Sequence, residues 1–150
     1  MHNKFLQVAI DTPLDSTFDY RCNESMVNSS LPQRGQFVRV PFGKREVAGL
    51  IVSVNQRSDV DPEKIRDVVE VRHQLSPLSS HWMALCEFAA EYYQRPFGEV
   101  ALPAVPKALR EAKVGALERA LKKLATQAKT SKSNQTETTQ HVTHTLNEQQ

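Results

Sequence analysis

The sequence has few cysteines, the residues that cross-link a fold through disulfides and often bind metals. Only two cysteines occur in 150 residues. Cys22 and Cys86 are far apart and form no CxxC pair, which is typical of reduced thiols and not of a disulfide framework or a metal site. No stretch approaches the ~20 apolar residues of a membrane span, and the N-terminus lacks the features of a signal peptide. We therefore expect a soluble, cytoplasmic protein with no membrane partner.

The common catalytic motifs are missing as well. The sequence contains no GxxxxGK(S/T) loop, no HExxH and no GxSxG. His141 and His144 are spaced like metal ligands, but they lie in a polar tail where solvated histidines are the simpler interpretation. Asp15 and Asp19 could form an acid/base pair, although a turn cap and a strand residue explain them more simply. We predict that this chain is not an enzyme and has no cofactor or metal site.

Five short stretches predict β-strands, because apolar and β-branched residues alternate or run together between turn residues. They are residues 5–11, 17–20, 36–40, 47–54 and 68–71. The continuous apolar run at 47–54 predicts a strand buried on both faces. Several short strands at close spacing favour a small closed or half-closed barrel.

A basic loop lies between the third and fourth of these stretches, in the sequence Val-Pro-Phe-Gly-Lys-Arg at residues 40–45. Pro41 has no N–H to donate and Gly43 can adopt a positive φ, so the chain can stop one strand and reverse here. Lys44 and Arg45 are then expected to project from a constrained tip.

After residue 79 the hydrophobic period changes from two to that of a helix. Ser79 or Ser80 is a suitable N-cap, and the apolar positions predict a helix over residues 80–94. We expect its aromatic residues Trp82, Tyr92 and Tyr93 to pack the helix on the barrel. Pro96 ends this helix, and residues 97–106 are predicted to be an extended return chain.

The C-terminal third differs in composition. Residues 106–133 carry eight lysines and arginines against two acidic residues, and leucines recur there at helical spacing. Residues 130–150 have too little apolar content to offset the entropy of ordering. The expected fold is therefore mainly β, an OB-like barrel with one packed helix over residues 1–106. A basic helical linker at 107–129 and a disordered polar tail at 130–150 follow it.

A small barrel with aromatic and basic residues near its loops suits single-stranded nucleic acid, through base stacking and phosphate neutralisation. The alternative is that these aromatic residues belong to the core. The barrel pattern alone leaves both open.

Three stretches in sequence resemble one family, the N-terminal 3′ DNA-binding domain of primosomal protein N′, the PriA replication-restart helicase. The stretches are Thr-Phe-Asp-Tyr at 17–20, Val-Arg-Val-Pro-Phe-Gly-Lys-Arg at 38–45 with Gly-Leu-Ile-Val at 49–52, and Tyr-Tyr at 92–93 followed by Phe-Gly-Glu-Val at 97–100 and Leu-Pro at 102–103. Their order and spacing match the family across residues 4–106. The resemblance implies a barrel that captures the 3′ end of a nascent leading strand at a stalled or branched replication fork.

The same resemblance implies which residues bind DNA. Phe18, Asp19 and Tyr20 match the motif that forms the pocket of the terminal nucleotide, with Gly43 at its rim. A carboxylate such as Asp19 can accept a hydrogen bond from a 3′-OH, which an internal nucleotide lacks. Lys44 and Arg45 would contact phosphates. The simpler alternatives are a turn cap for Asp19, a turn requirement for Gly43 and solvated loop charges for the two cations.

The chain departs from the family pattern in two ways. Where the family has a basic lysine, this sequence has Arg66, preceded by Ile65, and a guanidinium contacts phosphate with a different geometry. The ATPase motifs and zinc-binding cysteines of full-length members are absent, so ATP and zinc have no expected site. We predict fork DNA as the partner, with replication-restart proteins and a helicase core as further candidates. The alternatives are a truncated part of an ATP-dependent helicase and a protein-interaction barrel with no DNA affinity.

Overall fold

The computed structural model describes residues 4–23 and 31–111, together with residues 115–116, 118–119, 121–123 and 125–126. The chain divides into two compact units, residues 1–112 and 113–150. In the second unit the described residues are helical, as predicted for the basic segment. The polar tail that we expect to be disordered lies outside the described residues.

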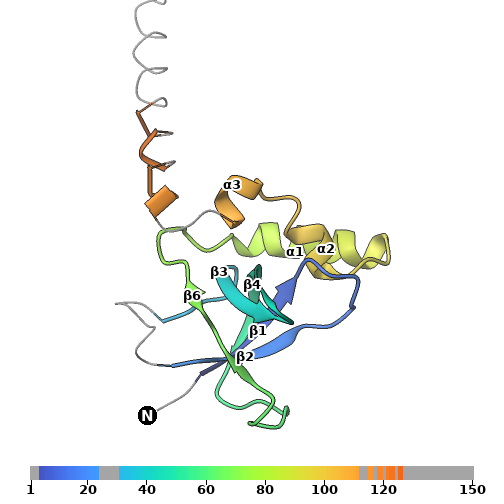
Figure 1. The fold of residues 1–150 in the computed structure, drawn as a ribbon. Helices are drawn as coiled ribbons and strands as arrows, with labels where there is room; N and C mark the ends of the chain where they lie inside the picture. Colours follow the sequence, from blue (N-terminus) through green and yellow to red (C-terminus); the bar gives the residue numbers. More distant parts are fainter. Residues whose placement is uncertain are drawn as a thin grey trace, which may run out of the picture. The chain divides into compact units, whose positions relative to one another are not determined.

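Six strands form one curled sheet in the first unit (Figure 1). They are β1 (Lys4–Ile10), β2 (Phe18–Cys22), β3 (Phe37–Phe42), β4 (Arg45–Asn55), β5 (Arg66–Asp67) and β6 (Glu70–Val71). Their order across the sheet is β5-β2-β1-β4-β3-β6. The predicted class, a mainly β, OB-like barrel, is confirmed.

The segment that the sequence predicted as one strand at residues 68–71 instead bridges the two edges of the sheet. β5 pairs with β2 at one edge, and β6 pairs with β3 at the other. Between them, the Val68 N–H donates to Arg21 O at 2.9 Å and the Val69 N–H donates to Arg39 O at 2.9 Å. Because successive amides point to opposite sides of an extended chain, two neighbouring residues can join two different strands. The predicted bounds were wrong for this reason.

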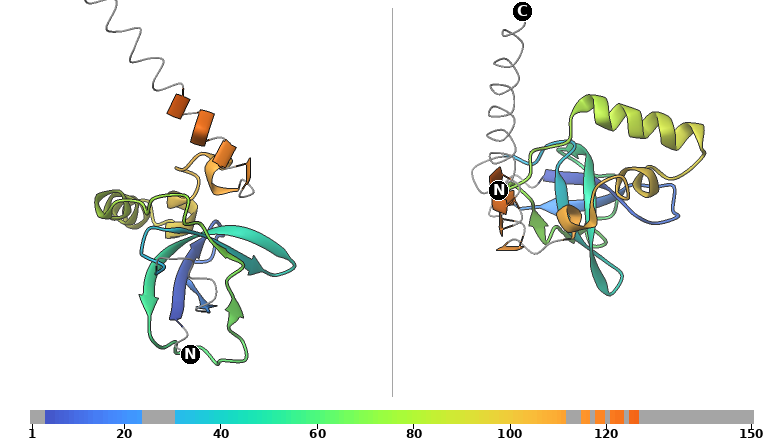
Figure 2. Two further views of the ribbon diagram at one scale, coloured as in Figure 1. Left: turned by 90° about the vertical axis from the view of Figure 1, so that its left-hand side faces the viewer. Right: turned by 90° about the horizontal axis from the view of Figure 1, so that it is seen from above.

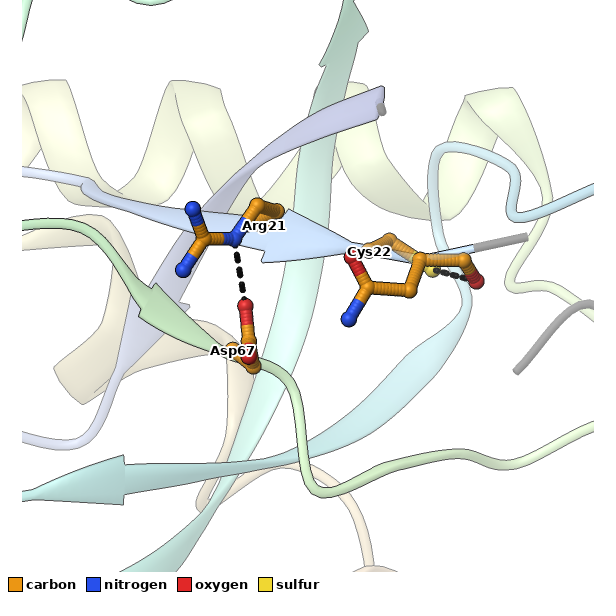
Figure 3. A network of polar contacts seen from close by, with 4 residues as sticks. Arg21, Cys22 and Asp67 are labelled. Atoms are coloured by element: carbon orange, nitrogen blue, oxygen red, sulfur yellow. Dashed lines mark hydrogen bonds and ion pairs between the residues drawn. The ribbon is translucent and has the colours of Figure 1, made fainter. Parts of the chain in front are cut away.

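An ion pair supports the short parallel pairing of β2 with β5. Arg21 Nε lies 2.6 Å from Asp67 Oδ1, and both side chains point to the same side of the two strands (Figure 3). Next to it, the Cys22 side chain is buried and contacts the backbone carbonyl of Asn23 at 3.9 Å. The edge strand is therefore held by a side-chain contact in addition to a two-residue ladder.

The neighbouring side chains at the centre of β4 enter two different cores, as those of Phe37 and Val38 do at the start of β3. Ile51 lies in the barrel interior, whereas Leu50 lies in a second cluster beneath the helices, and both are 0% exposed. Each such burial contributes roughly 1.5–3 kcal/mol. The prediction of burial on both faces is confirmed for the centre of this strand, while its ends are half-buried or exposed.

Three helices of the first unit lie together at one side of the sheet (Figure 2). They are α1 (Ser80–Tyr92), α2 (Phe97–Ala101) and α3 (Lys107–Arg110). The predicted N-cap is present, because Ser79 Oγ accepts a hydrogen bond from the Trp82 N–H at 3.2 Å. None of the described helices combines the length and the apolar character needed to cross a membrane.

The prediction of an extended chain at residues 97–106 was wrong, because α2 forms there. Pro96 precedes it with a φ of −53°, which suits a helix start. Gly98 lets this helix approach β1 closely, since a Cβ at that position would lie 1.9 Å from Ile10 O. Close packing against the sheet therefore selects a helix that propensity alone did not indicate.

The predicted packing face of α1 needs a second correction. The helix buries Met83, Cys86 and Ala90, and Trp82 is partly buried in the same cluster. Tyr92 and Tyr93 are each 70% exposed and do not pack on the barrel. The wide apolar stripe in the sequence left the orientation of the helix undecided, and the smaller residues face the core.

Candidate nucleic-acid interface

A cavity of about 270 Å³ lies where the start of β2 meets the β3–β4 hairpin. We call it the β2 pocket. Its lining residues are Thr17, Phe18, Asp19, Tyr20, Pro41, Phe42, Gly43, Val60, Lys64 and Arg66. Five residues that the sequence analysis assigned to one site, on β2, the hairpin and β5, thus meet in one cavity.

Aromatic rings form one wall of the β2 pocket. Phe18 and Phe42 pack edge to face, with ring centroids 5.2 Å apart and planes at 67°. Both rings also pack against the barrel core, so they are fixed from behind. This wall can hold a flat apolar group such as a nucleobase.

The Tyr20 hydroxyl ties β2 to the hairpin by donating to Pro41 O at 3.0 Å. Tyr20 is buried, and this burial raises the pKa of its hydroxyl more than the nearby Arg66 charge lowers it. The hydroxyl therefore stays protonated at neutral pH and remains a donor. Tyr20 acts on the pocket by holding its two walls together.

A second hydrogen bond to the hairpin comes from β5. Arg66 Nη1 donates to Gly43 O at 3.0 Å. Gly43 has a φ of +61°, and no heavy atom would lie within 4 Å of a Cβ at that position. The backbone conformation therefore favours glycine here, while the space above it stays open to a ligand.

Asp19 is half-buried on the same side as the hairpin glycine. The Ser58 hydroxyl donates to Asp19 Oδ2 and accepts from the Val60 N–H at 3.1 Å. A carboxylate has about four lone-pair positions, so this contact leaves further acceptor capacity at the pocket. Ser58 fixes the orientation of the carboxylate.

Three of the predicted residues are not brought into the β2 pocket. Ile65 is 5% exposed and contributes to the interior. Lys44 is exposed at the hairpin tip, and Arg45 lines a different cavity. Their roles in DNA binding stay predictions.

The structure also adds residues that sequence reasoning missed. Phe42, Lys64 and Val60 line the pocket, and Ser58 contacts its carboxylate. Lys64 lies two positions before Arg66 and could have been suspected as a second cation. The loop residues Ser58 and Val60 carry no local signal, because only the folded chain places them beside β2. In the described part of the chain, no three His, Cys, Asp or Glu side chains gather as a metal site would require.

Comparison with known proteins identifies the family. The model of the PriA 3′ DNA-binding domain (3′BD) matches residues 7–106. The replication restart protein PriA of Haemophilus influenzae is 34% identical over 109 residues, which make up 71% of this chain and 14% of that protein. PriA of Treponema pallidum is 25% identical over 111 residues, 71% of this chain and 17% of that protein. The chain thus spans only a small part of the length of these relatives. It belongs to the PriA 3′ DNA-binding domain family.

Proposed function

We propose that this chain binds the 3′ end of a nascent leading strand at stalled or branched replication forks, during replication restart. The observation that carries the proposal is the convergence of Asp19, an aromatic wall and the cations Lys64 and Arg66 on one cavity. Its volume of about 270 Å³ is slightly below the range of typical ligand pockets, which are roughly 300–1,000 Å³. Such a cavity suits the last nucleoside of a strand.

Recognition of an end requires a contact that an internal nucleotide cannot make. The terminal 3′-OH is a donor, and the half-buried carboxylate of Asp19 is an acceptor in the pocket. Leaving a charged acceptor without its partner costs on the order of 1.5–3 kcal/mol. This difference is what would separate a primer terminus from a continuous strand.

The remaining groups of the pocket favour binding without regard to base identity. Every base has a π-face, so the wall formed by Phe18 and Phe42 can hold any of the four. Lys64 and Arg66 are exposed at the pocket and can neutralise the phosphate next to the terminal nucleoside. We therefore expect selectivity for the end of the strand and tolerance of its sequence.

The proposed role of this chain is to bind DNA, while catalysis belongs to a helicase core. The matched relatives are named replication restart proteins, and this chain corresponds to 14% and 17% of their lengths. We propose that residues 1–106 bind DNA, that 107–129 form a basic linker and that 130–150 form a polar tail. In this arrangement the bound 3′ end orients the helicase core and other restart proteins on the fork.

Fluorescence anisotropy with labelled fork DNA tests this proposal. Wild-type protein should bind a fork ending in 3′-OH about 10-fold or more tightly than forks ending in 3′-H or 3′-phosphate, given the cost above. Asp19→Asn and Asp19→Ala should remove most of this preference. Asp59→Asn is the matched control, because it neutralises an exposed carboxylate of the nearby loop that does not line the pocket, and it should keep the preference for 3′-OH. Equal affinity of the wild type for all three ends would refute the proposal.

A further inference from the structure

A second cavity, of about 400 Å³, lies in the first unit and is lined in part by the same hairpin, from Arg45 onward. We call it the arginine cavity. Its lining residues are Asp11, Arg39, Arg45, Glu46, Val47, Ala48, Arg72, Arg110 and Glu111. They come from the end of β1, from β3 and β4, from the segment after β6 and from the end of α3. The proposed capture of a 3′ end does not use this cavity.

Two of its arginines pair with its carboxylates. Arg39 Nε lies 2.8 Å from Glu46 Oε2. Arg110 Nη1 lies 3.6 Å from Asp11 Oδ2 and 3.8 Å from Glu111 Oε1. All three carboxylates of the cavity are thus engaged by these two arginines. Four arginines and three carboxylates line the cavity, so its formal charge is 4 − 3 = +1.

Arg72 is the charge left without a counter-ion. It is 1% exposed, and it forms no ion pair within the part of the chain that the structure describes. Its Nη1 donates to Leu109 O at 3.2 Å, while its Nε is buried and has no hydrogen-bond partner. Burial is the main cause that lowers the pKa of this guanidinium, Glu70 raises this pKa in part, and the Arg39 charge lowers it further. A buried charge without a counter-ion is unfavourable, so this position favours the binding of an anion.

Two further groups of the cavity can contact the same anion. The Nε of Arg110 is also buried without a hydrogen-bond partner. Arg45 is exposed at the start of β4 and forms no ion pair with any described residue. Guanidinium groups offer several N–H donors in a fixed plane, which matches the oxygens of a phosphate.

The position of the cavity connects it to the 3′-end site. Gly43 lines the β2 pocket and Arg45 lines the arginine cavity. Lining residues of the two sites are therefore only two positions apart on one hairpin. A strand whose last nucleoside occupied the first site could therefore bring a phosphate nearer its 5′ end to the second. A backbone phosphodiester carries a single negative charge, which equals the excess positive charge of the cavity.

We infer that the arginine cavity binds a backbone phosphodiester of the DNA whose 3′ end occupies the β2 pocket, with Arg72 and Arg45 as its main contacts. The inference rests on the proposed function for its ligand. It assigns the two sites different main tasks, since the β2 pocket reads the terminus with its adjacent phosphate and the arginine cavity binds a phosphate further along the strand.

Binding of fork DNA to the full chain, measured by anisotropy at several salt concentrations, tests this inference. Neutralising one phosphate contact should reduce the slope of log K against log salt by about 1. We expect this reduction for Arg72→Gln and for Arg45→Gln, with affinity lowered about 3- to 10-fold near 0.15 M salt. Arg45 is exposed, so its variant tests the cavity even if the buried Arg72 variant fails to fold. Arg95→Gln, which removes an exposed arginine on the segment after α1, should leave the slope unchanged.

The preference for 3′-OH over 3′-phosphate separates the two hypotheses. If both cavity variants keep the wild-type slope and affinity, the inference is overturned, whatever the preference. If the slopes fall and the preference persists, the inference is supported. If the slopes fall but wild-type protein has no preference, the proposed 3′-end function fails while the phosphate site stands. Stabilisation of the wild type by inorganic phosphate, with DNA binding unchanged in both variants, would assign the cavity to free phosphate and overturn the DNA assignment.

Discussion

The β2 pocket and the arginine cavity share one hairpin but are built from different chemistry. The first has an aromatic wall, one carboxylate and two exposed cations in about 270 Å³. The second has four arginines and three carboxylates in about 400 Å³. Directional hydrogen bonds and stacking distinguish one chemical group from another, whereas phosphate contacts position a strand without reading it. If both proposals hold, recognition of an end depends mainly on the β2 pocket, and the arginine cavity contributes only to attraction to the backbone.

The largest effect that would test this separation is expected from Phe18→Leu. Leucine keeps the apolar packing of Phe18 on the core and on Phe42 but removes the π-face. Stacking contributes roughly 1–3 kcal/mol per base, so we expect affinity for forks with a free 3′ end to fall about 5- to 150-fold. Anisotropy with each of the four terminal bases should show the same loss.

Phe88→Leu provides the control for this substitution. Phe88 is 64% exposed on α1 and lines neither cavity, so its replacement should leave affinity within about twofold. The salt slope should not change in either variant, because no charge is removed. A reduced salt slope for Phe18→Leu would show that the two sites are coupled. It would contradict the proposed division of tasks between the β2 pocket and the arginine cavity.

The sequence predicted the β2 pocket better than the arginine cavity, for physical reasons. Phe18, Asp19 and Tyr20 are consecutive, and Pro41 with Gly43 marks a turn, so local patterns revealed most of the pocket. Arg72 follows a predicted strand in a polar stretch and looks like a solvated charge. Its burial depends on the segment that ends in α3, which supplies the carbonyl of Leu109. A contact between two residues that are 37 positions apart leaves no local pattern in the sequence.

The helices show the same limit of prediction from local sequence patterns. Apolar spacing located α1 and its N-cap, because both depend on neighbouring residues. It did not decide which apolar residues face the core, and it missed α2, whose fit on β1 depends on Gly98. Packing between elements distant in the sequence decided both outcomes.

An intermediate effect is expected from Arg66, which belongs to the β2 pocket but carries a charge. Arg66→Gln should lower affinity for fork DNA about 3- to 10-fold and reduce the salt slope by about 1. Arg66→Lys keeps the charge and should keep the slope, although it loses the planar donor that contacts Gly43 O. Anisotropy across a salt series measures both quantities.

These two variants sharpen the comparison by separating charge from geometry. If the contact between Arg66 and Gly43 shapes the pocket, Arg66→Lys should weaken the preference for 3′-OH while the slope stays at the wild-type value. Full retention of that preference would mean that the hairpin keeps its position through Tyr20 and Pro41 alone.

The smallest effect is expected from Lys44→Gln. Lys44 is exposed at the hairpin tip and lines neither cavity, so solvent and salt screen its interaction with DNA. At about 0.15 M salt we expect affinity to change by less than about twofold, compared with a several-fold loss for the neighbouring Arg45→Gln. Both residues carry the same charge and are adjacent in sequence, so a difference between them in the same titration reports position and not charge. Equal losses would mean that Arg45 acts with Lys44 as a diffuse positive surface at the hairpin tip, and the assignment of the arginine cavity would then rest on Arg72→Gln alone.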